Sequence, residues 1–172
     1  MLGLRREIAS AFATLLVFSI VVAGEVQVDA GYPGGNIIVE KTEGDAWFVK
    51  PDLRDTRGWW FYWNFRVTGA AGRTLTFRFT GQNPIGVRGP ALSRDCGLSW
   101  QWMGADAVRQ VVGQKAWEFS YRFDDKDEEV RFSFEIPYLE ADLQRFLERY
   151  RGNASLVVDE LCRTRKGRRV EC

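Results

Sequence analysis

Histidine is absent from the 172-residue sequence, and its absence restricts the chemistry that these residues could perform. Imidazole is the usual general base near neutral pH and a common zinc ligand. The sequence therefore excludes Ser-His and Cys-His nucleophilic pairs, and every zinc site that needs a histidine. Cys96, Cys162 and Cys172 lack the Cys-x-x-Cys spacing of a zinc cluster, and the sequence leaves open whether any two of them form a disulfide.

Carboxylates are concentrated in the segment 124–129, where five of the six residues are acidic. The segment lacks the glycine and the ligand spacing of a known calcium loop, so a solvated turn is the stronger expectation. Asp124 and Glu128 could be imagined as the carboxylate pair of a glycoside hydrolase, but nothing nearby would raise the pKa of one of them. We therefore expect no catalytic, cofactor-binding or metal-binding residue in this chain.

Basic and aromatic residues suggest two kinds of ligand. Five of the seven residues from 163 to 169 are Lys or Arg, but the run is short, has no interleaved aromatic residue, and belongs to a chain with a formal net charge of +1. We expect no nucleic-acid partner. Trp60 with Tyr62, or Trp100 with Trp102, could form an exposed platform on which a carbohydrate stacks, although aromatic residues that alternate along strands are more often core.

The elements that would position these residues are mainly strands, organised around the aromatic stretch 59–67. One face of this predicted strand carries Trp59, Phe61, Trp63, Phe65 and Val67, and the other carries Trp60, Tyr62, Asn64 and Arg66. Each large ring removes roughly 150–250 Å² from water when it is buried, so such a strand needs a partner sheet. We predict that it is the central strand of a β-sandwich.

Alternation of apolar and polar residues predicts several further strands. Residues 74–80 are expected to form a hairpin with the aromatic strand, and residues 117–123 and 130–136 a second hairpin around the acidic turn. Residues 81–97 are rich in Gly and Pro and are expected to be a long loop. The predicted fold class is therefore all-β, an antiparallel β-sandwich of about eight or nine strands with one C-terminal amphipathic helix.

Residues 139–151 change to helical spacing. The apolar positions of this predicted helix are Leu139, Leu143, Phe146, Leu147 and Tyr150. Gly152 is well placed just past its end, where a left-handed backbone conformation commonly terminates a helix.

The N-terminal segment 1–24 has the pattern of a secretory signal, with Arg5 and Arg6 before an apolar run and small residues at a possible cleavage site. We expect an exported protein, periplasmic or secreted. The alternative is an uncleaved segment that anchors the protein in a membrane, which would be its only membrane contact.

The order of several landmarks resembles the amino-terminal domain of cytosolic-carboxypeptidase-like members of the M14 zinc metallocarboxypeptidase family. The resemblance covers roughly residues 36–170 and is carried by Trp59, Trp60, Tyr62, Phe65, Trp100, Pro137, Tyr138, Gly167 and Arg168. In that family a β-sandwich precedes the catalytic domain, which binds zinc through a His-x-x-Glu pair and a later His. None of these ligands has a counterpart here, so no catalytic residue can be carried over.

The resemblance implies that residues 25–152 are an accessory β-sandwich domain, and residues 153–172 a linker and the start of a truncated M14 catalytic domain. The expected partner is that catalytic domain in cis, through which alone the chain would meet zinc and a peptide substrate. An apolar patch near the helix or the tail should then be exposed. The alternative is a stand-alone exported module that binds carbohydrate or protein.

Overall fold

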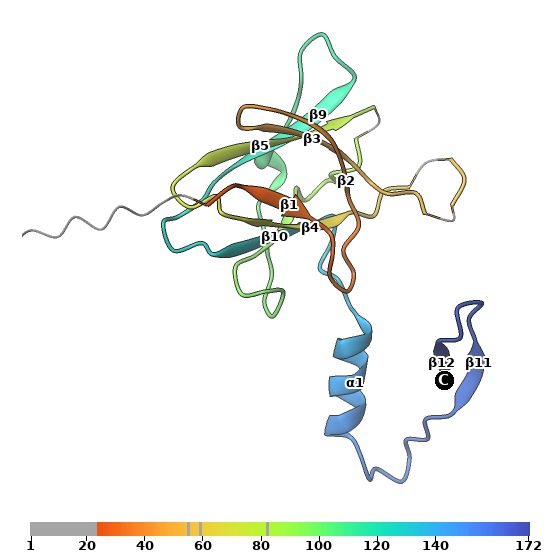
Figure 1. Cartoon of the computed structure of the whole chain (residues 1–172). Coiled ribbons are helices and arrows are strands. Elements are labelled where there is room, and N and C mark those ends of the chain that lie inside the picture. The colour runs from red at the N-terminus through yellow and green to blue at the C-terminus, as the bar shows by residue number, and fades with distance from the viewer. Residues whose placement is uncertain (1–23, 55, 59, 82) are drawn as a thin grey trace, which may run out of the picture.

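Strands with alternating apolar residues build two five-stranded sheets that pack face to face (Figure 1). The computed structural model describes residues 24–54, 56–58, 60–81 and 83–172, so the predicted signal segment lies almost wholly outside the described residues. The first sheet has the order β1 (Gln27–Asp29), β4 (Asn64–Thr68), β10 (Glu129–Ser133), β6 (Ala91–Ser93) and β7 (Gln101–Trp102). The second has the order β2 (Ile38–Glu43), β3 (Ala46–Lys50), β5 (Thr74–Thr80), β9 (Ala116–Arg122) and β8 (Val108–Gln110), with a short 3₁₀ helix η1 (Ala105–Ala107) before β8.

A chain of aromatic rings fills the space between the two sheets. Phe65 of the first sheet lies 4.9 Å from Phe77 of the second, ring centre to ring centre, and Phe119 lies 5.3 Å from Phe132. All four side chains are fully buried, and their rings are tilted, the arrangement that aromatic quadrupoles favour. The predicted all-β sandwich with one helix is confirmed, although one of its strand pairs, β3 with β5, is parallel.

The aromatic strand is shorter than predicted, because its ladder begins only at Asn64. Trp59 lies outside the described residues. The preceding backbone is held by side chains instead: buried Asn36 donates its amide hydrogen to the carbonyl oxygen of Tyr62 (3.2 Å), and the Tyr62 hydroxyl donates to the carbonyl oxygen of Gly34 (2.7 Å). Phe61, predicted to share a face with Trp63 and Phe65, is exposed and packs 4.8 Å from Phe134.

Both predicted hairpins are wrong. β4 and β5 belong to opposite sheets, and so do β9 and β10. The reason is that each pair of strands carries large rings on its inner face, and these rings are buried by facing one another across the core rather than by lying side by side in one sheet. The acidic segment 124–129 therefore joins the two sheets.

The predicted long loop 81–97 contains a buried strand, β6, which lies between β10 and β7 in the first sheet. Its three residues are too few to show alternation. The turn after it is ordered by Ser93, whose buried hydroxyl accepts the backbone N–H of Gly97 (2.9 Å) and donates to Asp95 (2.7 Å).

Residues 138–172 form an arm that leaves the sandwich, visible as the blue segment in Figure 1. It consists of the predicted helix, α1 (Glu140–Arg149), followed by a two-stranded hairpin of β11 (Glu160–Arg163) and β12 (Arg169–Glu171). Gly152 has a φ of 88°, the left-handed conformation expected after the helix. Within the described ranges, no helix is long and apolar enough to cross a membrane.

Candidate functional site

A zinc centre does not fit the residues present. The part of the chain that the structure describes contains no cluster of three or more His, Cys, Asp or Glu side chains that could hold a metal ion. The sequence also has no histidine, so its donor set consists of carboxylates and thiols alone. We derive no catalytic step through zinc for this chain.

The acidic segment 124–129 uses its carboxylates to shape the connection between the sheets. Asp127 is buried, and its side chain accepts the backbone N–H of Asp124 (2.9 Å). Arg94 forms an ion pair with Asp124 (3.1 Å). Asp127, rather than Asp124 or Glu128, is thus the carboxylate withdrawn from solvent. The arrangement is that of a structural turn and shows no pair of facing carboxylates.

The three cysteines are free thiols, and all three are exposed. Cys96 has a left-handed backbone conformation, with a φ of 58°. Partial desolvation of the thiol and the neighbouring Glu129 carboxylate raise the pKa of Cys96. A thiol in this environment is less readily ionised, which does not favour a nucleophilic role.

The aromatic residues proposed as a carbohydrate platform do not form one flat surface. Trp60 is 37% exposed and stacks on Phe61, with ring centres 5.5 Å apart. Trp100 is half-buried and donates its indole N–H to the carbonyl oxygen of Gly97 (3.1 Å). Trp102 lies beneath the Arg88 guanidinium, 5.5 Å from the ring centre.

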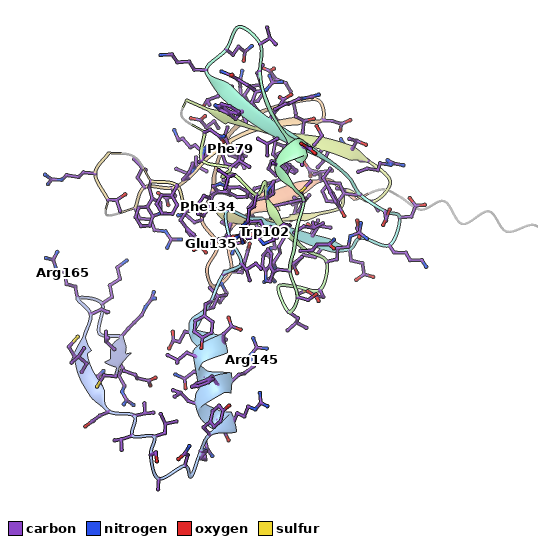
Figure 2. The ribbon with its side chains drawn as sticks, turned by 180° about the vertical axis from the view of Figure 1, so that it is seen from behind. Phe79, Trp102, Phe134, Glu135, Arg145 and Arg165 are labelled. Atoms are coloured by element: carbon purple, nitrogen blue, oxygen red, sulfur yellow. The ribbon has the colours of Figure 1, made fainter. Side chains whose placement is uncertain are left out.

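Trp102 instead contributes to a small pocket on the sandwich. Figure 2 shows it near Phe134 and Glu135, and the same three residues line a cavity of about 240 Å³ with the segment 85–89. This cavity has one exposed cation, Arg88, and one exposed carboxylate, Glu135. Of the residues that line this cavity, only Trp102 was a candidate ligand-binding residue on the basis of the sequence.

Large apolar side chains are exposed along the arm, near the predicted helix and the tail. The exposed large apolar side chains of the arm are Tyr138, Phe146, Tyr150, Leu156, Val157, Val158 and Leu161. Phe146 and Tyr150 lie one helical turn apart, and their rings pack 4.9 Å from each other. Exposed apolar side chains therefore occur near the helix and the tail, where an apolar patch was expected.

A groove separates α1 from the rest of the arm. Its volume is about 350 Å³, and its apolar walls are Leu147 and Tyr150 on one side and Leu156 and Val158 on the other. Across its rim the Gln144 side-chain amide donates to the Glu171 carboxylate (3.0 Å). Helix and hairpin thus lie on either side of an open groove that has both apolar and charged walls.

The arm is attached to the sandwich through Leu139. A Cβ atom added to Gly34, whose φ is 82°, would lie 2.5 Å from a methyl group of Leu139, so the leucine occupies space that only glycine leaves open. Asp142 accepts the backbone N–H of Leu139 (2.8 Å) and caps the helix. That hydrogen bond lowers the pKa of Asp142.

The hairpin turn carries the basic cluster noted in the sequence. Arg163 and Arg169 each form an ion pair with Glu160, at 2.9 Å in both cases. Arg165, Lys166 and Arg168, in contrast, have no carboxylate partner among the described residues. Figure 2 shows Arg165 at the tip of the hairpin.

The residues that carried the family resemblance are spread over the molecule. Phe65 is in the buried core. Trp60, Tyr62 and Trp100 lie at one end of the first sheet or in its loops. Pro137 and Tyr138 join the sandwich to the arm. Gly167 and Arg168 lie in the hairpin turn, where Gly167 has a φ of 77°. The structure does not bring these residues together into one site.

Several solved structures are similar to this chain, and three of them show the extent of the likeness. A candidate carboxypeptidase from Burkholderia mallei ATCC 23344 superposes with a TM-score of 0.66 at 23% sequence identity, over 85% of this chain and 38% of that chain. A metallo-carboxypeptidase from Burkholderia cenocepacia gives a TM-score of 0.64 at 20% identity, over 85% and 38%. A metallo-carboxypeptidase from Pseudomonas aeruginosa, solved with (2-guanidinoethylmercapto)succinic acid, gives 0.59 at 22% identity, over 84% and 39%.

The fold is carboxypeptidase-related. At these sequence identities the likeness concerns the fold, and the chain spans less than two fifths of the length of the metallo-carboxypeptidases that it matches. No protein-family model matches the chain, and no curated protein matches it significantly. The carboxypeptidase-related fold includes the sandwich and reaches into the arm, since it covers more of the chain than the sandwich alone.

Proposed function

We propose that this chain is the non-catalytic accessory domain of an M14-type zinc carboxypeptidase. In this proposal the sandwich and the arm pack on a catalytic domain, support its folding and shape the access of a peptide substrate. The observation that carries it is the combination of a carboxypeptidase-related fold with an arm that exposes several large apolar side chains in the described part of the chain.

The zinc chemistry in this proposal belongs to the catalytic domain. There the metal would polarise the scissile carbonyl and activate a water molecule. The described residues contribute a rigid aromatic core and a docking surface, and none of them acts on the substrate bond. Export through the N-terminal segment 1–24 is part of the same proposal, supported by its basic start and apolar run.

The test is to isolate the native protein from its source with an antibody against the sandwich. Its intact mass, zinc content and release of C-terminal residues from a peptide panel would then be measured. We expect a zinc-binding catalytic polypeptide in the same chain or bound to it, and peptide hydrolysis that a chelator abolishes and added zinc restores.

A different result would contradict the proposal. If the isolated material consists of this chain alone, holds no zinc and releases no residue from any peptide, the accessory role is wrong. Binding of a carbohydrate panel to that same material would then support the stand-alone module instead.

A further inference from the structure

A cavity lies on the outer face of the first sheet, next to the start of the arm. Asn64 and Arg131 line it from the sheet, residues of the segment 96–100 from the loop after β6, and residues of the segment 137–145 from the arm. We call it the Arg131 cavity. Its volume of about 220 Å³ is below the ~300–1,000 Å³ of most ligand pockets, so it fits a small molecule.

The guanidinium of Arg131 is held in one orientation beside this cavity. Its Nε–H donates to the Glu129 carboxylate (2.7 Å), and its planar face lies over the Tyr32 ring, 4.4 Å from the ring centre. A Cβ atom added to Gly97, whose φ is 88°, would lie 3.1 Å from Nη1 of Arg131, so the guanidinium uses space that a glycine leaves open. The side chain is only 16% exposed. A group that is already immobilised loses little further freedom when a ligand binds to it.

The other two nitrogens of this guanidinium are open to a ligand. Nη1 and Nη2 of Arg131 donate to no acceptor among the described residues. Neither is fully buried, because within the described ranges a fully buried side-chain donor without a partner occurs only at the indole nitrogen of Trp47. Two parallel N–H groups on the planar fork of an arginine match the two oxygens of a carboxylate.

The charges that line the Arg131 cavity leave one positive charge in excess. They are those of Arg131, Arg145 and Asp142, and Asp142 already forms an ion pair with Arg145. Glu129 does not line the cavity, and its carboxylate is shared between Arg131 and Arg66 (3.5 Å). This balance suits a ligand with a single negative charge better than a phosphate dianion.

Much of the remaining lining is apolar. Leu98, Trp100, Pro137 and Leu139 contribute apolar surface to the cavity. Leu98 is 74% exposed, and the half-buried Trp100 is fixed by its indole hydrogen bond to the carbonyl oxygen of Gly97 (3.1 Å). Covering these side chains with the apolar part of a ligand would remove them from water, which is favourable.

We propose that the Arg131 cavity binds a small monocarboxylic acid with an apolar body. The carboxylate accepts hydrogen bonds from Nη1 and Nη2 of Arg131, and the body contacts Leu98, Trp100 and Leu139. Arg145, labelled on α1 in Figure 2, adds an exposed positive charge at the rim. This site is separate from the proposed accessory function and does not depend on it.

The test is a titration of the 172-residue chain with sodium benzoate, followed by proton–nitrogen correlation NMR. We expect the signals of the Trp100 indole N–H and the Arg131 Nε–H to shift and saturate with a Kd near ~1 mM, as is ordinary for so small a ligand. Benzyl alcohol has a similar body without the charge and should bind at least about tenfold more weakly. Acetyl-leucine distinguishes two sources of the carboxylate: tighter binding than benzoate supports the end of a peptide, and weaker binding a free acid.

Two variants separate recognition from folding. Arg131→Gln should weaken benzoate binding at least about tenfold. Because Arg131 also supports the sheet, the second variant, Ala141→Trp, leaves it in place and fills the cavity from α1, which should abolish binding in a chain that still unfolds cooperatively. The matched controls Arg122→Gln and Ala154→Trp change exposed residues that do not line the cavity and should bind benzoate as the wild type does.

Three results would overturn the inference. The first is the absence of a saturable shift at Trp100 and Arg131 up to about 20 mM benzoate. The second is binding of benzyl alcohol as tight as that of benzoate, which would show that Arg131 takes no part. The third is equally tight binding of inorganic phosphate that Ala141→Trp leaves unchanged, which would show an adventitious ion only. None of the three bears on the accessory function, which the mass and zinc content of the native protein test separately.

Discussion

Trp63 and Trp60 show how differently two tryptophans of one aromatic run are used. Trp63 is fully buried, lies 4.9 Å from Phe79, and donates its indole N–H to the carbonyl oxygen of Pro84 (2.9 Å). Trp60 remains partly exposed. The alternation of the sequence predicted that the two lie on opposite faces of the strand. It could not predict the Pro84 contact, because that hydrogen bond joins residues brought together only by the sandwich.

Glu118 is a buried carboxylate that no pattern in the sequence singled out. Arg78 and Arg109, on the strands either side of β9, each donate to it at 2.7 Å. Burial alone would raise the pKa of Glu118, but the hydrogen bonds from the two guanidinium groups outweigh it and lower the pKa from its ordinary value of 4.5. The charged carboxylate therefore links three strands of the second sheet.

We predict that Glu118→Gln lowers the free energy of unfolding by about 1–3 kcal/mol near neutral pH. A carboxyl whose pKa is lowered by folding stabilises the protein above its unfolded pKa, and that contribution is lost as the pH falls through the folded pKa. The difference between wild type and variant should therefore shrink below the ordinary value of 4.5. Urea unfolding at about pH 7 and about pH 3.5 measures both quantities.

The matched control for this prediction is Glu43→Gln, which removes an exposed ion pair with Lys41 (2.6 Å). Exposed pairs contribute little, so we expect a change below about 0.5 kcal/mol. A Glu118→Gln effect that stays constant across the pH range would show that the lost interaction is not one of charge.

At the scale of elements, the sequence predicted where strands lie better than how they pair. Alternation reports which side chains share a face, and β5 and β9 were found close to their predicted positions. It does not report which strand is the neighbour. β5 pairs with β3 and β9 instead of β4, because the rings of β4 and β5 meet across the core.

The apolar residues of the arm were predictable from helical spacing, but the attachment of the arm was not. It depends on Leu139 meeting Gly34, residues far apart in the sequence. The groove beside α1 and the bulge at Leu161 likewise depend on how the hairpin folds back. These features require the three-dimensional structure.

We predict that Gly34→Ala changes the direction of the arm relative to the sandwich. The added methyl group would displace Leu139, and alanine is strained at a φ of 82°. Nitroxide labels on Cys172 and on a Lys115→Cys variant, with Cys96 and Cys162 replaced by Ser, would report the distance between arm and sandwich. We expect a shifted or broadened distance distribution and a folded sandwich by circular dichroism.

Gly44→Ala is the control, because an added Cβ meets nothing within 4 Å at Gly44 although its φ is also positive, at 61°. It carries the same kind of backbone strain without a displaced neighbour. If both variants give the same label distances as the wild type, Leu139 does not set the direction of the arm.

At the scale of the whole molecule, the sandwich holds the buried core and the arm holds none of it. Among the residues that the structure describes, every buried apolar side chain lies between Val26 and Phe132, and α1 has no buried residue. We predict that a chain ending at Tyr138 folds with a thermal midpoint within about 5 °C of the full chain, because it keeps every core contact. Differential scanning calorimetry measures this, and a shortened chain without a cooperative transition would contradict it.

The interleaving of the two sheets has a consequence for synthesis of the protein on the ribosome. β10 lies in the first sheet between β4 and β6, yet it is the last strand of the sandwich to be made. Until residues 129–133 emerge, β4 and β6 each keep an open edge and the first sheet cannot be completed. Folding must therefore wait for contacts of long sequence separation, which are slow to form. The nascent chain exposes its aromatic residues throughout that wait, so the protein should depend on chaperones more than its small size suggests.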